Sequence, residues 1–202
     1  MALPRFCSHC AAPLPSPPPV ACRSCDTSHW LDAKPYAGAL VSRGGKLLLV
    51  RRAQRPWKGA WDLPGGFCRV REHPKAAAAR EVREETALEV ELDGVLGMWI
   101  DAYGPEGTDK ITLNIYFHAS ARGSIETRPE PNEIAEIAWF APDELPEPLA
   151  FPDHLPAVLR AWRASLEDAP RAAPARAAAQ SRTVRLRTRR ACAAGVRMKD
   201  RP

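Results

Sequence analysis

Runs of apolar residues separated by turn-forming residues predict β-strands over much of this chain. AGALVSR and KLLLVRR have the character of two strands, and the Gly44-Gly45 pair between them is a hairpin signal. Three later runs are similar, and Gly, Pro and Asp are frequent in the segments that connect them. These runs are LEVELDGVLGMWI, KITLNIYFHAS and EIAEIAWF. We expect each run to form a strand.

Two stretches have helical patterns instead. One runs from Pro74 to about Thr86, where a proline suits the first turn and KAAAAREV is a strong helix former. The other covers residues 154–166, where apolar residues recur at helical spacing and predict a face packed into the core. These residues are Leu155, Val158, Leu159, Trp162 and Leu166. Beyond Pro170 the periodicity is lost.

The net charge of the 202-residue chain is +5, and it is unevenly distributed. The segment from Arg171 to Pro202 has a net charge of +9, which leaves −4 for the residues before it. We therefore predict that residues 167–202 form a basic, disordered tail on a mildly acidic body. Such a tail either makes weak contacts with polyanions such as nucleic acid or has no dedicated partner.

The sequence shows no targeting or membrane-spanning segment. The opening MALPRFCSHC has no basic stretch followed by an apolar run. No stretch approaches the roughly 18 apolar residues that a transmembrane helix needs. We therefore expect a cytoplasmic protein with no membrane partner.

The first 33 residues are rich in Cys, Pro and Ser and are too few to build an apolar core without a cross-link. Their cysteines form two pairs with C-x2-C spacing, which suits tetrahedral zinc in a closed structural site. The predicted zinc ligands are Cys7, Cys10, Cys22 and Cys25. Two disulfides are the alternative, which a cytosolic location disfavours. Ala11 and Asp26 stand where a glycine often helps such a knuckle to turn.

The segment REVREET gathers negative charge on one side of the first predicted helix. Glu81, Glu84 and Glu85 fall within an arc of roughly 100°. Like charges four residues apart destabilise a helix by about 0.2–0.5 kcal/mol per pair. A cation among the carboxylates would remove that cost, and hard divalent ions such as Mg²⁺ prefer oxygen ligands. The alternative is a solvated helix face with no ligand.

These glutamates belong to a longer pattern, G-x5-E-x7-R-E-V-x-E-E-x-A-L. It resembles the Nudix box of the Nudix hydrolases, GX5EX7REUXEEXGU, in which U is a bulky aliphatic residue. The matching positions are Gly66, Glu72, Arg80, Glu81, Val82, Glu84, Glu85 and Leu88. Ala87 replaces the late glycine of the box, which usually adopts a left-handed conformation that costs alanine about 1–2 kcal/mol. We expect this departure to affect stability before activity.

The resemblance implies an α/β protein: a Nudix α/β/α sandwich with a mixed sheet at residues 36–166, preceded by a small zinc ribbon at residues 1–33. It also implies a site for Mg²⁺, or Mn²⁺, that grips a diphosphate. Carried over by position, the ligands would be Glu81, Glu84, Glu85 and the backbone carbonyl of Gly65. Arg80 and Glu72 would orient and support these ligands.

The reaction implied by the resemblance is hydrolysis of an acid anhydride. Water would attack one phosphorus of a nucleoside diphosphate linked to a second group, X, and release a nucleoside monophosphate and phosphorylated X. The metal would lower the pKa of water and stabilise the developing charge. The family takes its general base from a box glutamate or from a later loop, where Glu133 and Glu136 are the candidates. Surface positions beside a strand are the alternative for both.

Substrate recognition rests on fewer residues. Arg52 ends a predicted strand and could contact phosphate, whereas Trp61 and Tyr103 could stack on a base. With its cysteine pairs, the chain resembles zinc-ribbon Nudix pyrophosphatases, which act on NADH, ADP-ribose or FAD. The SQPWPFPxS-type stretch of the NADH enzymes is missing after the box. We therefore expect an ADP-ribose-like substrate.

Two other functions stay open. One is a hydrolase that removes altered nucleoside triphosphates from the nucleotide pool. The other is a non-catalytic, nucleic-acid-binding regulator that uses the ribbon and the tail, with the box as a sensor. The complete set of box glutamates argues against the regulator. The sequence does not fix the oligomeric state, and a homodimer is one option.

Overall fold

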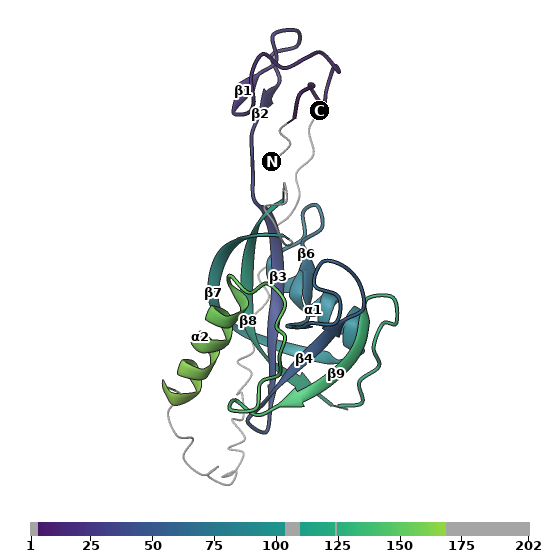
Figure 1. Ribbon diagram of the computed structural model, residues 1–202, viewed down its shortest axis with the longest axis vertical. Helices are drawn as coiled ribbons and strands as arrows, with labels where there is room; N and C mark the ends of the chain where they lie inside the picture. The colour runs from purple at the N-terminus through teal and green to yellow at the C-terminus, as the bar shows by residue number, and fades with distance from the viewer. Residues whose placement is uncertain (1–3, 104–109, 124, 169–202) are drawn as a thin grey trace, which may run out of the picture. The chain divides into compact units, whose positions relative to one another are not determined.

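The structure is a computed structural model that describes residues 4–103, 110–123 and 125–168 (Figure 1). The predicted basic tail lies outside the described residues, apart from its first two positions. Most of the YGPEGTDK segment that follows the third predicted strand lies outside them as well. No helix among the described residues is long and apolar enough to cross a membrane.

The main sheet is mixed and has seven strands within the described part of the chain. Its order is β5 (Trp61–Asp62), β4 (Lys46–Arg52), β3 (Lys34–Arg43), β8 (Ile111–Arg122) and β7 (Glu89–Ala102). Two further strands join this path: β6 (Gly65–Phe67) pairs with β3, and β9 (Ile134–Phe140) pairs with β4. The strands β3 and β8 are parallel, and the other pairs are antiparallel. In Figure 1, β3 runs through the middle of this arrangement.

Helices cover both faces of the sheet, and each helix closes its own hydrophobic core. Helix α1 (Pro74–Thr86) buries Ala77, Ala78 and Val82 against one face. Helix α2 (Leu155–Asp168) buries Leu155, Val158, Leu159 and Trp162 against the other. Because both faces are covered, the middle strands are apolar on both sides and read as continuous hydrophobic runs. This three-layer arrangement confirms the predicted fold class.

Successive residues of β3 supply the two cores in turn. Ala37, Ala39 and Val41 pack under α1, whereas Tyr36 and Leu40 pack under α2. This is the period-two alternation of a strand. The hairpin from β3 to β4 turns at Gly44 and Gly45, whose φ angles of 56° and 77° are left-handed as a tight hairpin requires.

The predicted elements agree closely with the observed ones. Helix α1 begins at Pro74 and ends at Thr86, as predicted, and its Ncap is His73, whose Nδ1 accepts a hydrogen bond from the Lys75 N–H. Four of the five residues in the predicted apolar stripe of α2 are buried. The fifth, Leu166, is 41% exposed, because it lies in the last turn of α2 beyond the edge of the core.

At the N-terminus, β1 (Val20–Ala21) and β2 (Ser28–His29) form a separate two-stranded antiparallel sheet. The second pair of cysteines lies in the turn between these strands. The loop that carries the first pair is closed by a bridge between Phe6 and Pro13. These few backbone pairings are all the regular structure that the segment has among the described residues, in keeping with a fold that depends on its cysteines.

Candidate active site and metal centre

A cavity of about 330 Å³ lies where α1, β4, β6 and the segment before β9 meet. Most of its lining is polar. The box contributes Gly66, Phe67, Glu81 and Glu85, and the residue before it, Gly65, also lines the cavity. The rest of the lining is Tyr36, Val50, Arg52, Gln54, Arg55, Asp62, Leu63, Tyr103, Glu133 and Ile134. The structure therefore brings part of the predicted metal site and residues from distant parts of the sequence to one place.

The glycine that opens the box is required by close packing. The carboxylate of Glu81 lies so near the Gly66 backbone that a Cβ on residue 66 would be 2.4 Å from Glu81 Oε1. No side chain can occupy that space without moving the carboxylate. The spacing between glycine and glutamate in the box thus follows from a contact between the β6 backbone and the helix.

Glu85 is buried with little to stabilise its charge. The residue is 8% exposed, and its Oε2 accepts one hydrogen bond from the Gly65 N–H at 3.1 Å. Burial raises the pKa of Glu85 well above its usual range, and the nearby charge of Asp62 raises it further. Burial also raises the pKa of Glu81, although Arg80 opposes that shift. A cation beside these carboxylates would offset the cost of burying them.

Arg80 organises the outer side of this cluster. Its Nε and Nη2 donate to the two carboxylate oxygens of Glu72 at 2.7 and 2.8 Å, and Nη1 donates to Glu81 at 2.6 Å. Hydrogen bonds from Arg80, aided by the Arg69 N–H, lower the pKa of Glu72 to about 2. Arg80 also donates to the carbonyl of Phe67. This network fits the supporting role that the resemblance implies for Arg80 and Glu72.

Glu84 has a different environment from the other two predicted metal ligands. It is exposed and does not line the cavity. Its carboxylate is shared by Arg80 Nη1 at 2.9 Å and Arg69 Nη2 at 3.1 Å. A metal ion would have to compete with both arginines for this ligand.

The cavity lining also contains an ion pair that was not predicted from the sequence. Arg52 Nη1 donates to Asp62 Oδ2 at 2.8 Å, and Asp62 Oδ1 accepts from the Leu63 N–H at 2.8 Å. Asp62 is 1% exposed, and burial raises its pKa while Arg52 opposes the shift. The guanidinium of Arg52 also lies over the ring of Phe151 at 5.3 Å and donates to the Pro56 carbonyl. Arg52 is thus fixed in place beside the predicted catalytic cluster.

The two candidate bases outside the box are placed differently. Glu133 lines the cavity, and its charge contributes to the raised pKa values of Glu81 and Glu85. Glu136 lies on β9 opposite Arg51 and forms an exposed ion pair with it at 3.4 Å. The geometry therefore favours Glu133.

The two predicted stacking residues also differ. Tyr103 lines the cavity and packs against Phe67, with ring centroids 5.1 Å apart. Trp61 is buried in the core, edge-on to Phe140 at 5.0 Å, and is not part of the cavity lining. The placement of Trp61 gives no support to a role in stacking on a base.

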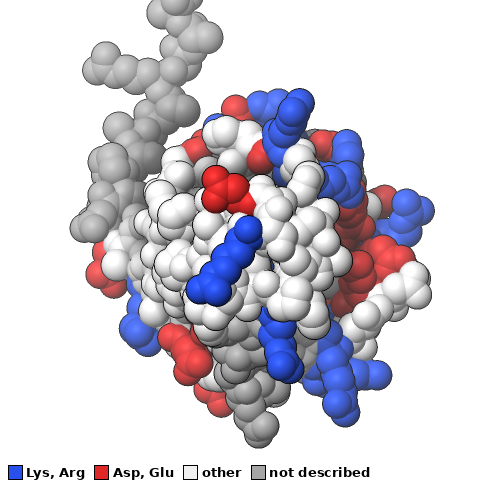
Figure 2. All heavy atoms as spheres, turned by 90° about the horizontal axis from the view of Figure 1, so that it is seen from above, with Lys and Arg blue, Asp and Glu red and all other residues white. Residues whose placement is uncertain are grey.

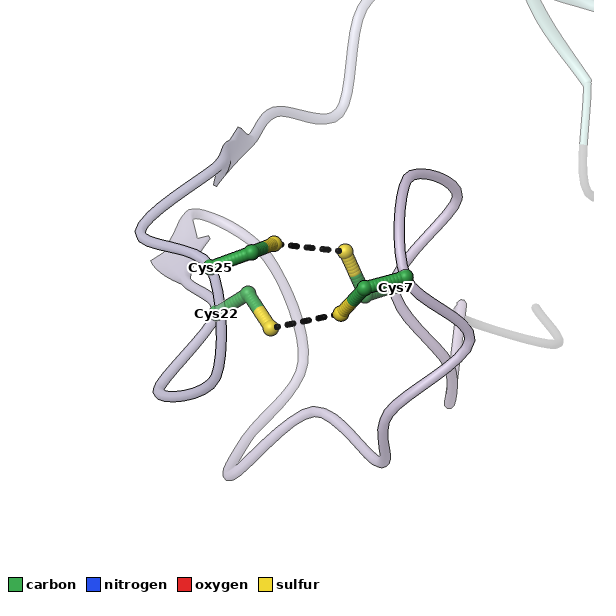
Figure 3. A group of neighbouring side chains, drawn as sticks. Cys7, Cys22 and Cys25 are labelled. Atoms are coloured by element: carbon green, nitrogen blue, oxygen red, sulfur yellow. Dashed lines mark hydrogen bonds between the residues drawn. The ribbon is translucent and has the colours of Figure 1, made fainter.

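The N-terminal cysteines converge as a metal centre requires. Figure 3 shows their sulfur atoms pointing toward one another, and all four lie within 4.8 Å of each other. The Cys7–Cys25 and Cys10–Cys22 sulfur distances are both 3.6 Å. A disulfide would need about 2.05 Å, whereas a tetrahedron of sulfurs about 2.3 Å from zinc has edges of roughly 3.8 Å. The donor set and the spacing fit zinc.

Both cysteine knuckles turn through left-handed residues that are not glycine. Ala11 and Asp26 have φ angles of 60° and 59°, at the positions where the sequence pattern led us to look for glycine. Their N–H groups donate to the carbonyls of Cys7 and Cys22 at 2.9 and 2.8 Å. Polar groups also approach the sulfurs: His29 Nε2 lies 3.3 Å from the sulfur of Cys7. Such contacts commonly orient metal ligands.

Comparison with known proteins identifies the family. A family model described as the NUDIX domain matches residues 33–161, well over half of the chain. A "MutT-like protein" of Streptomyces ambofaciens is 34% identical over 124 residues, which cover 61% of this chain and 73% of that protein. A protein of Stutzerimonas stutzeri named "NAD-capped RNA hydrolase NudC" is 31% identical over 145 residues, 70% of this chain. The chain spans only 50% of that relative.

A solved structure supports the fold independently. The crystal structure of a NUDIX hydrolase from Nitrosomonas europaea superposes with a TM-score of 0.66 at 24% identity, covering 82% of this chain and 92% of that one. These matches confirm the family and the fold class that the box predicted.

Proposed function

Since this chain belongs to the NUDIX family, we propose that it hydrolyses the pyrophosphate of a nucleoside diphosphate joined to a second group, X, in a reaction that needs Mg²⁺ or Mn²⁺. Water adds to one phosphorus, the bond to the bridging oxygen breaks, and the products are a nucleoside monophosphate and phosphorylated X. The observation that carries this proposal is the cavity in which Glu85 is buried without a cation bonded to it among the described residues, beside the partly buried Glu81, whose carboxylate is held by Arg80.

The residues that would hold the divalent ion are Glu81, Glu84, Glu85 and the carbonyl of Gly65. When bound, such an ion neutralises phosphate oxygens and acidifies water. Arg80 keeps the carboxylate of Glu81 in position through its 2.6 Å contact. Glu133 is proposed to accept the proton of the attacking water, because it lines the cavity and bonds to no cation among the described side chains.

ADP-ribose is the first substrate to test. Relatives of this chain are named for hydrolysis of NAD-capped RNA, but the chain spans only half of the Stutzerimonas protein. The chain also lacks the SQPWPFPxS-type stretch that the NADH enzymes carry after the box. The missing stretch favours a smaller ADP-X over the nicotinamide dinucleotides.

The layout of the chain is part of the proposal. We propose a structural zinc ribbon at residues 1–33, a catalytic domain at 36–166 and a basic tail at 167–202. The four converging sulfurs support the ribbon. Figure 2 shows acidic and basic side chains mixed around a largely uncharged centre on one face of the described residues. That face of the described residues has no continuous basic surface.

The test is a screen of nucleoside diphosphate derivatives with Mg²⁺, in which mass spectrometry identifies the products. The expected result is a nucleoside monophosphate and phosphorylated X, with Glu85→Gln as the inactive control. Release of inorganic pyrophosphate from nucleoside triphosphates as the preferred reaction would instead show a nucleotide-pool hydrolase. Absence of turnover with every compound would overturn the enzymatic proposal.

A further inference from the structure

Among the described residues, two cations line the cavity, and only one of them is bonded to other described residues. Arg52 is held by Asp62, by the Pro56 carbonyl and by the ring of Phe151. Arg55 also lines the cavity, but it is exposed and makes no ion pair or side-chain hydrogen bond with any described residue. Among the described cavity residues, Arg55 is therefore the cation available to a ligand.

The loop that carries Arg55 is anchored on both sides. The Ala53 N–H donates to the Glu133 carbonyl at 2.7 Å, and the side-chain amide of Gln54 donates to the Asn132 carbonyl. On the other side, the Pro56 carbonyl accepts from Arg52 Nε at 2.8 Å. The backbone of Arg55 is thus tied to the cavity wall, while its side chain has no bonding partner among the described residues. An anchored backbone, together with a guanidinium that is not bonded to any described residue, suits the recognition of an anion.

The charges of the proposed substrate require such a group. The glutamates and a divalent ion can serve the phosphate at which hydrolysis occurs. The second phosphate of the diphosphate carries its own negative charge and needs a cation of its own. Arg52 is already paired with Asp62. The planar fork of a guanidinium matches phosphate oxygens better than other cationic side chains do.

We propose that Arg55 binds the substrate phosphate that lies away from the glutamates, and so makes the site selective for diphosphates over monophosphates. This inference rests on the proposed function, because it assumes that a diphosphate occupies the cavity. It assigns a role to a residue outside the box. Lys58 provides a matched comparison: it is an exposed cation on the same loop that does not line the cavity.

The experiment compares two ligands that the proposed reaction cannot hydrolyse: a diphosphate with a methylene bridge, and a monophosphate. Calorimetry with Mg²⁺ measures binding of α,β-methylene-ADP and of AMP to the wild type, Arg55→Ala, Arg55→Lys and Lys58→Ala. Arg55→Ala should weaken the binding of α,β-methylene-ADP by about tenfold and change the binding of AMP by less than about twofold. A tenfold loss is the size expected for one charge-assisted contact at an exposed position. Arg55→Lys should recover part of the loss, and Lys58→Ala should match the wild type.

Several results would overturn the inference. Equal weakening of both ligands, or a similar loss in Lys58→Ala, would show a general effect of charge. No change in Arg55→Ala would show that the residue is a solvated surface cation. Kinetics with ADP-ribose separate this failure from failure of the proposed function: turnover with an unchanged KM in Arg55→Ala would leave the function standing and remove the inference. Unaltered thermal midpoints would exclude misfolding.

Discussion

Replacing Ala87 with glycine should stabilise the protein. Ala87 is the Ccap of α1 and has φ 63° and ψ 11°, in the left-handed region. Its N–H donates to the Arg83 carbonyl at 3.0 Å, so the conformation is fixed by the end of the helix. The side chain is exposed, and removing its methyl group therefore costs little packing.

The size of the effect follows from two opposing terms. Alanine pays about 1–2 kcal/mol to enter the left-handed region. Glycine avoids that cost but loses about 0.5–1 kcal/mol more in backbone entropy on folding. The free energy of unfolding should therefore rise by about 0.5–1 kcal/mol in Ala87→Gly, which corresponds to about 1–4 °C in the thermal midpoint for a chain of this size.

The same substitution elsewhere in α1 should have the opposite sign. Ala76 is also exposed, but it lies inside the helix, where glycine costs about 0.5–1 kcal/mol relative to alanine. Thermal and urea unfolding of both variants, with hydrolysis measured in parallel, test the argument. If Ala87→Gly lowers the midpoint, or if both variants shift alike, the left-handed conformation is not the cause. A large change in activity would contradict our view that Ala87 concerns stability.

Four further outcomes are expected. Glu85→Gln should lower kcat at least about 100-fold, and near-normal turnover would contradict the role assigned to Glu85. The same change should raise the thermal midpoint of the metal-free protein, because it removes a buried charge. A mild chelator should abolish activity reversibly by removing Mg²⁺ and leave zinc bound, which elemental analysis of protein purified under reducing conditions would check. Arg80 lowers the pKa of Glu72 from 4.5 to about 2, so the ionised form contributes stability that is lost as pH falls through that interval. Glu72→Gln should flatten the dependence of the midpoint on pH there, and an unchanged slope would exclude Glu72 as its source. Deleting residues 171–202 should leave kcat/KM and the midpoint nearly unchanged at two salt concentrations, whereas a loss above about tenfold that persists at high salt would show that the tail builds part of the site.

Most of the helix that carries the site could be predicted, because its signals are local. The proline at position 74 opens α1, and the spacing of the box places Glu81 and Glu85 about one turn apart. What sequence could not show is how their environments differ. Glu85 is buried, while Glu84 is exposed between two arginines. That difference depends on which side of α1 meets β6, and this is a tertiary contact.

The residues outside the box that line the cavity depend on strand register, which the sequence does not reveal. The pairing of β4 with β9 sets Arg51 opposite Glu136, and the two form an exposed pair. Glu133 precedes β9 and enters the cavity lining. A polar residue between apolar neighbours, as Asp62 is in WDLPGGF, was the one available sign of the ion pair with Arg52.

At three turns the motif pattern predicts a left-handed backbone, although the residue at that position does not favour this conformation. The family and zinc-knuckle patterns called for glycine at positions 11, 26 and 87, and the backbone is left-handed at all three although none is glycine. At each position the N–H donates to the carbonyl four residues earlier. The residue preference of about 1–2 kcal/mol is of the same size as the cost of leaving that N–H unpaired, and each turn also fixes the position of a nearby cysteine or glutamate. The arrangement of ligands therefore dictates the turn, and the chain accepts the less favourable residue.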